Sequence, residues 1–122
     1  MTLAIQGVYE VAIKVRNLEV AEAFYRDVLG LEVGLRDPNR PWTFMRAGAG
    51  MIVLQEQADV PQQHFAFTVS AADIDAAAAE LRRRGNAVDG PVVHEWIPAE
   101  SLYFADPDGH DVELCAPFAR PA

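Results

Sequence analysis

The sequence predicts an α+β fold in which two tandem βαβββ modules form a curved mixed sheet around a pocket. A strand with alternating apolar residues is followed by an amphipathic helix and then by three short strands. This order occurs twice, and a shift of 54 residues, from position 10 to position 64, places the first strand and helix of one copy on those of the other. No long linker separates the copies, so residues 1–122 are interpreted as one domain.

The first module covers about residues 8–57. Its first strand spans residues 10–15, where apolar side chains alternate with more polar ones. Asn17 can cap the following helix, and Gly30 can end it in the left-handed conformation. The apolar stripe of this helix has helical spacing and consists of Leu18, Ala21, Phe24, Tyr25 and Val28. Short strands are expected near residues 31–37, 42–47 and 51–56.

The second module covers about residues 62–117 and repeats this order. A strand at residues 64–69 precedes a start that resembles a capping box, with Ser70 and Asp73. Gly85 ends the helix, whose apolar stripe consists of Ile74, Ala77, Ala78 and Leu81. Strands are expected near residues 87–93, 101–105 and 111–116. Residues 106–109 read Asp-Pro-Asp-Gly, which is typical of a type I turn.

Composition restricts the class of protein. With 122 residues the chain can bury a core, and its single cysteine, Cys115, excludes an internal disulfide. The chain does not open on a secretory signal, and its apolar runs end well short of the ~20 residues that span a bilayer, so a cytoplasmic protein without membrane contact is expected. A net charge of −8 argues against nucleic acid as a partner. The surplus carboxylates favour solubility and could also attract a cationic ligand.

Three residues are candidates for chemistry. Glu10 and His64 begin the first strand of their modules, and a pseudo-twofold relation between the modules would bring them together. Glu113 shares a strand face with Asp111 and Cys115, and the opposite face is apolar. A mid-strand carboxylate in a small barrel-like sheet is costly to bury unless a partner or a cation compensates its charge. From these residues alone, the simpler interpretation is that His64 is an ordinary half-buried histidine on a strand and that Glu113 is a surface residue.

The chain resembles the vicinal-oxygen-chelate superfamily, which includes glyoxalase I, fosfomycin-resistance thiol transferases, bleomycin-resistance proteins and extradiol dioxygenases. The resemblance covers nearly the whole chain, from Tyr9 to Pro117. It rests on an ordered set of segments, which read VAIKV at 11–15, AFYRDVLGL at 23–31, HFAF at 64–67 and LYFADPDGHDVEL at 102–114. The resemblance implies that one divalent metal ion is held by Glu10, His64 and Glu113.

The predicted ligand set departs from the family pattern. The first ligand is usually His or Gln, whereas this chain has Glu10, and the fourth ligand position falls on the apolar Leu54. Glu56 shares the face of Leu54 but is not counted as a ligand. An oxygen-rich, open site suits Mn²⁺, Fe²⁺, Co²⁺, Ni²⁺ or Mg²⁺ better than Zn²⁺.

The resemblance also places residues at the wall of a substrate pocket: Trp42, Phe44, Trp96, Ser101 and Tyr103. Ser101 and Tyr103 match positions that contact the phosphonate in the fosfomycin-resistance branch. The cationic loop of that branch is absent, because residues 93–100 contain no Lys or Arg, and its catalytic Thr is replaced by Ala12. Fosfomycin is therefore not the expected substrate. His94 and His110 are interpreted as loop or surface residues.

The function that the resemblance implies is Lewis-acid catalysis on a small oxygen-rich substrate, with stabilisation of an oxyanion or enolate. Glu10 is the candidate catalytic base, because it replaces a neutral ligand. The alternative is a metal-free binding protein that sequesters a cationic drug such as bleomycin. A homodimer is expected in either case, because chains of this length in the family pair their modules within or across subunits.

Overall fold

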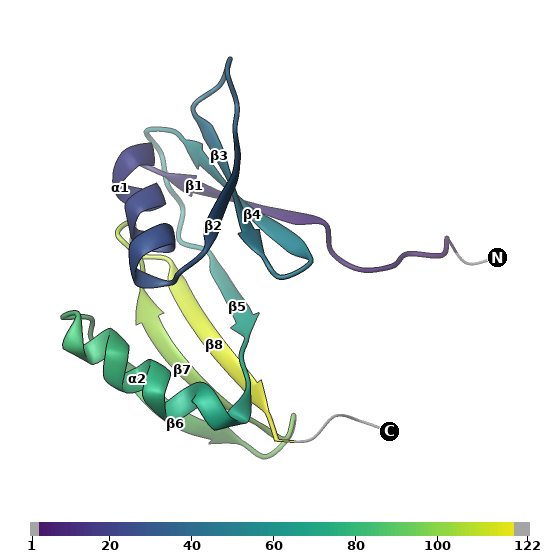
Figure 1. Ribbon diagram of the computed structural model, residues 1–122, viewed down its shortest axis with the longest axis vertical. Coiled ribbons are helices and arrows are strands. Elements are labelled where there is room, and N and C mark those ends of the chain that lie inside the picture. Colours follow the sequence, from purple (N-terminus) through teal and green to yellow (C-terminus); the bar gives the residue numbers. More distant parts are fainter. Residues whose placement is uncertain (1–2, 119–122) are drawn as a thin grey trace. The chain divides into compact units, whose positions relative to one another are not determined.

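The computed structural model of the protein describes residues 3–118 and consists of two compact units, one ending at Pro61 and the other beginning at Gln62. Each unit contains a four-stranded mixed sheet and an α-helix (Figure 1). The strand order is β1-β4-β3-β2 in the first sheet and β5-β8-β7-β6 in the second. The two predicted βαβββ modules are therefore confirmed. No helix within residues 3–118 is long and apolar enough to span a membrane.

In the first unit, the first strand pairs in parallel with the last, and the other neighbours are antiparallel. The elements are β1 (Glu10–Val15), α1 (Leu18–Ala23), a π-helical turn (Phe24–Val28), β2 (Glu32–Arg36), β3 (Trp42–Ala47) and β4 (Gly50–Glu56). Helix α1 packs on β3 and β4. Ile13 on β1 and Tyr25 on the helical turn are both fully buried, so these apolar side chains form the core of the unit.

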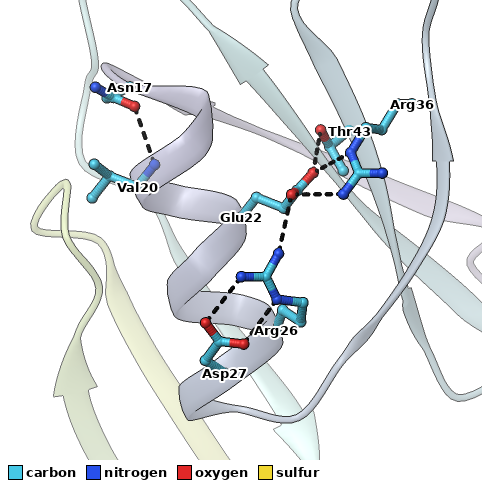
Figure 2. Close-up of polar contacts among 7 residues, drawn as sticks. All are labelled: Asn17, Val20, Glu22, Arg26, Asp27, Arg36 and Thr43. Carbon is cyan, nitrogen blue, oxygen red and sulfur yellow. Dashed lines mark hydrogen bonds and ion pairs between the residues drawn. The ribbon is translucent and has the colours of Figure 1, made fainter.

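Two side chains determine where α1 begins. The Asn17 Oδ1 atom accepts a hydrogen bond from the backbone N–H of Val20 at 3.1 Å (Figure 2), which confirms the predicted cap. Glu56, at the end of β4, accepts a second bond from the N–H of Leu18 at 2.9 Å. These two bonds satisfy N–H groups that have no partner within the helix. Gly30 follows the helical turn with a φ of 75°, as predicted.

A cluster of charged side chains joins α1 to the edge of the sheet. The two carboxylate oxygens of Glu22 accept bonds from Nε and Nη2 of Arg36, both at 2.9 Å (Figure 2). Glu22 also accepts bonds from Thr43 Oγ1 at 3.1 Å and from Arg26 at 3.4 Å. The hydrogen bond from Arg36 holds the pKa of Glu22 below its ordinary value of 4.5, against the effect of its partial burial. Glu22 therefore holds the helix against β2 and β3 as an ionised group.

The second unit has the same topology. Its elements are β5 (His64–Thr68), a 3₁₀ turn (Ala71–Asp73), α2 (Ile74–Arg83), β6 (Asp89–His94), β7 (Ala99–Ala105) and β8 (Asp111–Pro117). Three members of the predicted stripe of α2 are buried: Ile74, Ala78 and Leu81. The predicted capping box at Ser70 is wrong, because the Ser70 side chain makes no capping hydrogen bond. The 3₁₀ turn that follows Ser70 delays the start of α2 to Ile74, so the spacing that a capping box requires is lost.

The strand register corrects one prediction about the first unit. Ala66, two residues into β5, pairs with Glu113 on β8. Ala12, two residues into β1, pairs with Val53 on β4. The position that corresponds to Glu113 is therefore Val53 and not Leu54. The sequence alone does not give this equivalence, because the two modules have connections of different length between their first and last strands.

Candidate functional site

His64 and the last strand of the second unit form the centre of the candidate site. His64 is the first residue of β5 and pairs with Asp111 in the parallel ladder. Its Nδ1 atom lies 3.1 Å from the carbonyl oxygen of Asp111 and 3.0 Å from Oδ2 of the same residue. Both oxygens are acceptors, so in a neutral His64 ring we assign the proton to Nδ1. The other ring nitrogen, Nε2, then presents a lone pair.

That lone pair faces a carboxylate. The Nε2 atom of His64 lies 3.2 Å from Oε1 of Glu113. Glu113 is a buried residue in the middle of β8, and only 11% of its side chain is exposed, compared with 52% for His64. Its other oxygen, Oε2, accepts a hydrogen bond of 2.6 Å from the hydroxyl of Ser101, which is fully buried. Glu113 is thus held from one side and open to His64 from the other.

Two lone pairs at this distance repel each other unless a positive charge lies between them. A proton on Nε2 would give an ion pair between an imidazolium and a carboxylate. A metal cation bound by both atoms would satisfy the same pair of groups. Either solution compensates the charge of a carboxylate that would otherwise be costly to bury.

Tyr103 and His94 extend the polar groups of this face. Tyr103 pairs with Glu113 across β7 and β8, and its hydroxyl lies 2.9 Å from Nε2 of His94. Burial raises the pKa of the Tyr103 phenol, and the negative charge of Glu113 raises it further. The phenol therefore stays protonated at neutral pH. The interpretation of His94 as a loop or surface residue is wrong, because it is half-buried at the end of β6 and its ring contacts Tyr103.

A pocket of about 420 Å³ opens beside His64. It is lined by residues 62–64, 103–105 and 109–111, which are the beginnings of β5 and β8 and the end of β7. Both His64 and Tyr103 line it, so it offers space for a small ligand next to the two polar side chains.

Glu10, the third predicted ligand, is an exposed residue at the start of β1 and belongs to the first unit. Within residues 3–118, no three His, Cys, Asp or Glu side chains form a group able to hold a metal. In the second unit this follows from the geometry of His64, because its two ring nitrogens face different carboxylates, those of Asp111 and Glu113. The three-residue site of Glu10, His64 and Glu113 stays a prediction.

The predicted wall residues have different surroundings. Trp42 and Phe44 lie half-buried on β3, and the guanidinium of Arg40 stacks 4.1 Å from the centroid of the Trp42 ring. Trp96 is 81% exposed, in the turn after β6, with its ring edge against His94. Ser101 is fully buried. Its hydroxyl already donates a hydrogen bond to Glu113, whereas Trp42, Phe44 and Trp96 have exposed surface that a ligand could contact.

One residue of the site was missed in the sequence. The sequence pattern predicts His110 to be a loop or surface residue, but its side chain is fully buried. Its Nδ1 atom accepts a hydrogen bond of 3.0 Å from the backbone N–H of Gln63, next to His64. The alternation of β8 held a signal, because His110 shares the orientation of Val112 and Leu114, both of which are buried.

The repeated βαβββ unit is the fold of one protein superfamily. The Glyoxalase/Bleomycin resistance protein/Dioxygenase superfamily model matches residues 7–114, and the chain belongs to that superfamily. Among curated proteins, the chain is 27% identical to the metallothiol transferase FosB of Staphylococcus epidermidis, over 90% of this chain and 83% of that protein.

Solved structures show the same relationship. The integron cassette protein HFX_CASS4, from the mobile metagenome of the Halifax Harbour sewage outfall, is 48% identical with a TM-score of 0.87, over 92% of this chain and 99% of that one. TnmS3, an antibiotic-binding protein from Streptomyces sp. CB03234, is 28% identical with a TM-score of 0.81, over 95% and 99% of the two chains. The chain is thus similar both to a protein named as a transferase and to one described as a binding protein.

Proposed function

We propose that the protein is a divalent-metal-dependent enzyme that acts on a small oxygen-rich organic substrate. Glu10, His64 and Glu113 would hold the ion, and Mn²⁺, Fe²⁺, Co²⁺, Ni²⁺ or Mg²⁺ suits this set better than Zn²⁺. The observation that carries the proposal is the contact of 3.2 Å between the Nε2 atom of His64 and the Oε1 atom of Glu113. The similarity to a protein named metallothiol transferase supports the same conclusion.

The spacing of His64 and Glu113 fits two ligands of one metal ion. Two ligand atoms that are each about 2.1 Å from one ion, at right angles, lie about 3 Å apart. The observed distance between the His64 and Glu113 atoms, 3.2 Å, is close to that value. Both groups are also held by a second partner, Asp111 for the histidine and Ser101 for the carboxylate. Metal-binding residues are commonly supported in this way, because the partner fixes the tautomer and the orientation of the ligand.

A bound ion would act as a Lewis acid for an oxyanion or enolate on the substrate. The protein's own residues would bind and orient the substrate and move its protons. The phenol of Tyr103 is protonated, lines the pocket and can donate or accept a hydrogen bond. Glu10 would serve as the base, since a carboxylate is better suited to accept a proton than the neutral ligand it replaces.

The charges of the second unit favour a neutral or cationic substrate. Strands β5 to β8 contain no Lys or Arg, and they carry four carboxylates: Asp89, Glu100, Asp111 and Glu113. An anionic phosphonate would be repelled by these carboxylates, since like charges at close range are unfavourable. We therefore propose a substrate different from the phosphonate of the fosfomycin-resistance branch, although the chain is similar to FosB.

A second candidate function is a metal-free binding protein for a cationic drug. The same pair of residues supports it, because a protonated His64 and an ionised Glu113 form a satisfied ion pair without a metal. The net charge of −8 and the similarity to TnmS3, an antibiotic-binding protein, point in the same direction. In this function Trp42, Phe44 and Trp96 would provide the aromatic surface for the drug.

Metal analysis separates the two functions. Protein purified without chelator is expected to contain about one divalent ion per chain, and the His64→Ala variant is expected to lose it. If wild-type protein contains no ion and takes up none of Mn²⁺, Co²⁺ or Ni²⁺, the enzyme proposal is wrong and the binding protein becomes the better assignment.

A further inference from the structure

We propose that His110 is a positioning residue that fixes the start of β5 and so aims the His64 ring at Glu113. This inference rests on the proposed function, because it assigns His110 a role in the metal site. The imidazole of His110 is fully buried, and no step of the proposed chemistry uses it.

Several hydrogen bonds connect the residues around His64 to those that open β8. The side-chain amide of Gln62 donates to the carbonyl of Gly109 at 3.0 Å. The N–H of Asp111 donates to the carbonyl of Gln63 at 2.9 Å. The N–H of Gln63 donates to Nδ1 of His110 at 3.0 Å. Only the second of these bonds joins backbone to backbone, so side chains provide most of the connection.

The bond to His110 replaces a backbone partner. The parallel ladder of β5 and β8 begins with the pair of His64 and Asp111, so Gln63 lies just before it. The imidazole of His110 accepts the N–H of Gln63 and extends the ladder by one position. This N–H is part-buried, and leaving it without an acceptor would be unfavourable, so the bond helps to fix where the chain enters the strand.

The backbone of His110 is itself held in place. Its residue follows the Asp-Pro-Asp-Gly turn, and the backbone N–H of His110 donates to Oδ1 of Asp106 at 2.9 Å. The same turn is closed by the bond from the N–H of Gly109 to the carbonyl of Asp106 at 3.0 Å. The predicted turn thus positions the backbone of His110, and the imidazole of His110 binds the N–H of Gln63. Gln63 directly precedes His64.

A small displacement of residues 62–64 would change the geometry of the proposed metal site. His64 lies one residue beyond Gln63, and its two nitrogens already contact Asp111 and Glu113 at hydrogen-bonding distances. If the start of β5 shifts, the Nε2 atom of His64 moves relative to Glu113. Removal of a residue that supports a metal ligand typically weakens metal binding 10- to 100-fold.

A matched pair of variants tests this role. In His110→Asn the side-chain oxygen lies on the same branch as Nδ1 and can accept the N–H of Gln63. In His110→Gln the acceptor lies one bond further out. With Mn²⁺ as the probe in calorimetry, we expect the Asn variant to bind close to wild type and the Gln variant to bind roughly 10- to 100-fold more weakly. Both variants should keep the circular dichroism spectrum of the folded protein. Equal weakening in both, or in neither, would overturn the proposal.

Nuclear magnetic resonance provides a readout that needs no metal. In the metal-free wild type, a scalar coupling across the hydrogen bond should join the amide nitrogen of Gln63 to Nδ1 of His110. The ring nitrogen signals of His64 should shift in His110→Gln and stay unchanged in His110→Asn. Absence of the coupling, or identical His64 signals in all three proteins, would overturn the role of His110. If the wild type binds no Mn²⁺, the proposed enzyme function fails, and these signals still decide whether His110 positions His64.

Discussion

The Nε2 atom of His64 lies 3.2 Å from Oε1 of Glu113, and the strand register explains why they meet. His64 pairs with Asp111 in the parallel ladder, and Glu113 lies two residues further along β8 on the same face. The imidazole therefore reaches along the strand from one carboxylate to the next. This single arrangement permits both a metal site and an ion pair.

Added metal should stabilise the protein, and acid should remove the stabilisation. Protons compete with the metal for the imidazole and the carboxylates, so the gain is largest at high pH and falls as pH decreases. With Mn²⁺ or Ni²⁺ at about 100 times its Kd, the gain is about 2.7 kcal/mol. Thermal melts at about pH 8 and about pH 5.5 measure it. An equal gain in wild type and in His64→Ala would show that the ion binds elsewhere.

Replacing Glu10 tests whether the first unit contributes a ligand. Glu10→Ala is expected to weaken Mn²⁺ binding at least tenfold. Loss of a residue that only supports a metal ligand already weakens binding by roughly 10-fold or more, and loss of a ligand should weaken it at least as much. Glu95→Ala is the matched control, because Glu95 is an exposed carboxylate outside the predicted site. Calorimetric titration of both variants gives the comparison. Unchanged affinity in Glu10→Ala would restrict the ligands to the second unit.

Removing the hydroxyl of Ser101 should destabilise the fold. Ser101→Ala deletes the hydrogen bond of 2.6 Å to Glu113 and leaves a buried carboxylate oxygen without that donor. Hydrogen bonds to charged groups contribute about 1.5–3 kcal/mol, so a loss of this size is expected in urea unfolding. Ser101→Cys, which keeps a weak donor, should lose less. Equal stability of Ser101→Ala and wild type would mean that water replaces the hydroxyl.

The charge cluster around Glu22 should make stability depend on pH. The pKa of Glu22 is lowered in the folded state, so its contribution is present above its ordinary value of 4.5 and is lost as the pH falls through the lowered pKa. Glu22→Gln should therefore lower stability near neutral pH by about 1 kcal/mol, and the difference should shrink in acid. Glu19→Gln, at an exposed position of the same helix, is the control. Denaturant unfolding at several pH values measures both, and a constant difference would contradict the assignment.

The protein is expected to be a homodimer, with twice the chain mass of 13.4 kDa in light scattering at micromolar concentration. Several apolar side chains near the start of the chain are exposed, among them Leu3 at 83% and Ile5 at 81%. A second copy would cover such residues. A mass of one chain, with metal binding intact, would show that a single chain completes the site.

Local sequence rules predicted the elements that depend on local chemistry. The cap at Asn17, the left-handed Gly30 and the turn at residues 106–109 each depend on a few adjacent residues, and each occurs as predicted. The spacing rule failed at Ser70, because a 3₁₀ turn lies between Ser70 and α2 and the Ser70 side chain makes no capping hydrogen bond.

The features of the site that were missed depend on pairing between distant strands. His110 contacts Gln63, which is 47 positions away in the sequence, and no local pattern indicates that contact. Likewise, the position equivalent to Glu113 is fixed by the register of β1 with β4 and not by counting along the chain. The contact of His64 with Glu113 was anticipated only because the family resemblance supplied the long-range pairing.

The equivalence of Val53 and Glu113 means that the two repeated units use the same strand position in different ways. One scaffold carries an isopropyl group at this position and the other a carboxylate, and Val53 is fully buried. For a protein engineer, Val53→Glu would place a carboxylate at the equivalent position of the first unit and would show how much buried charge that unit can accommodate.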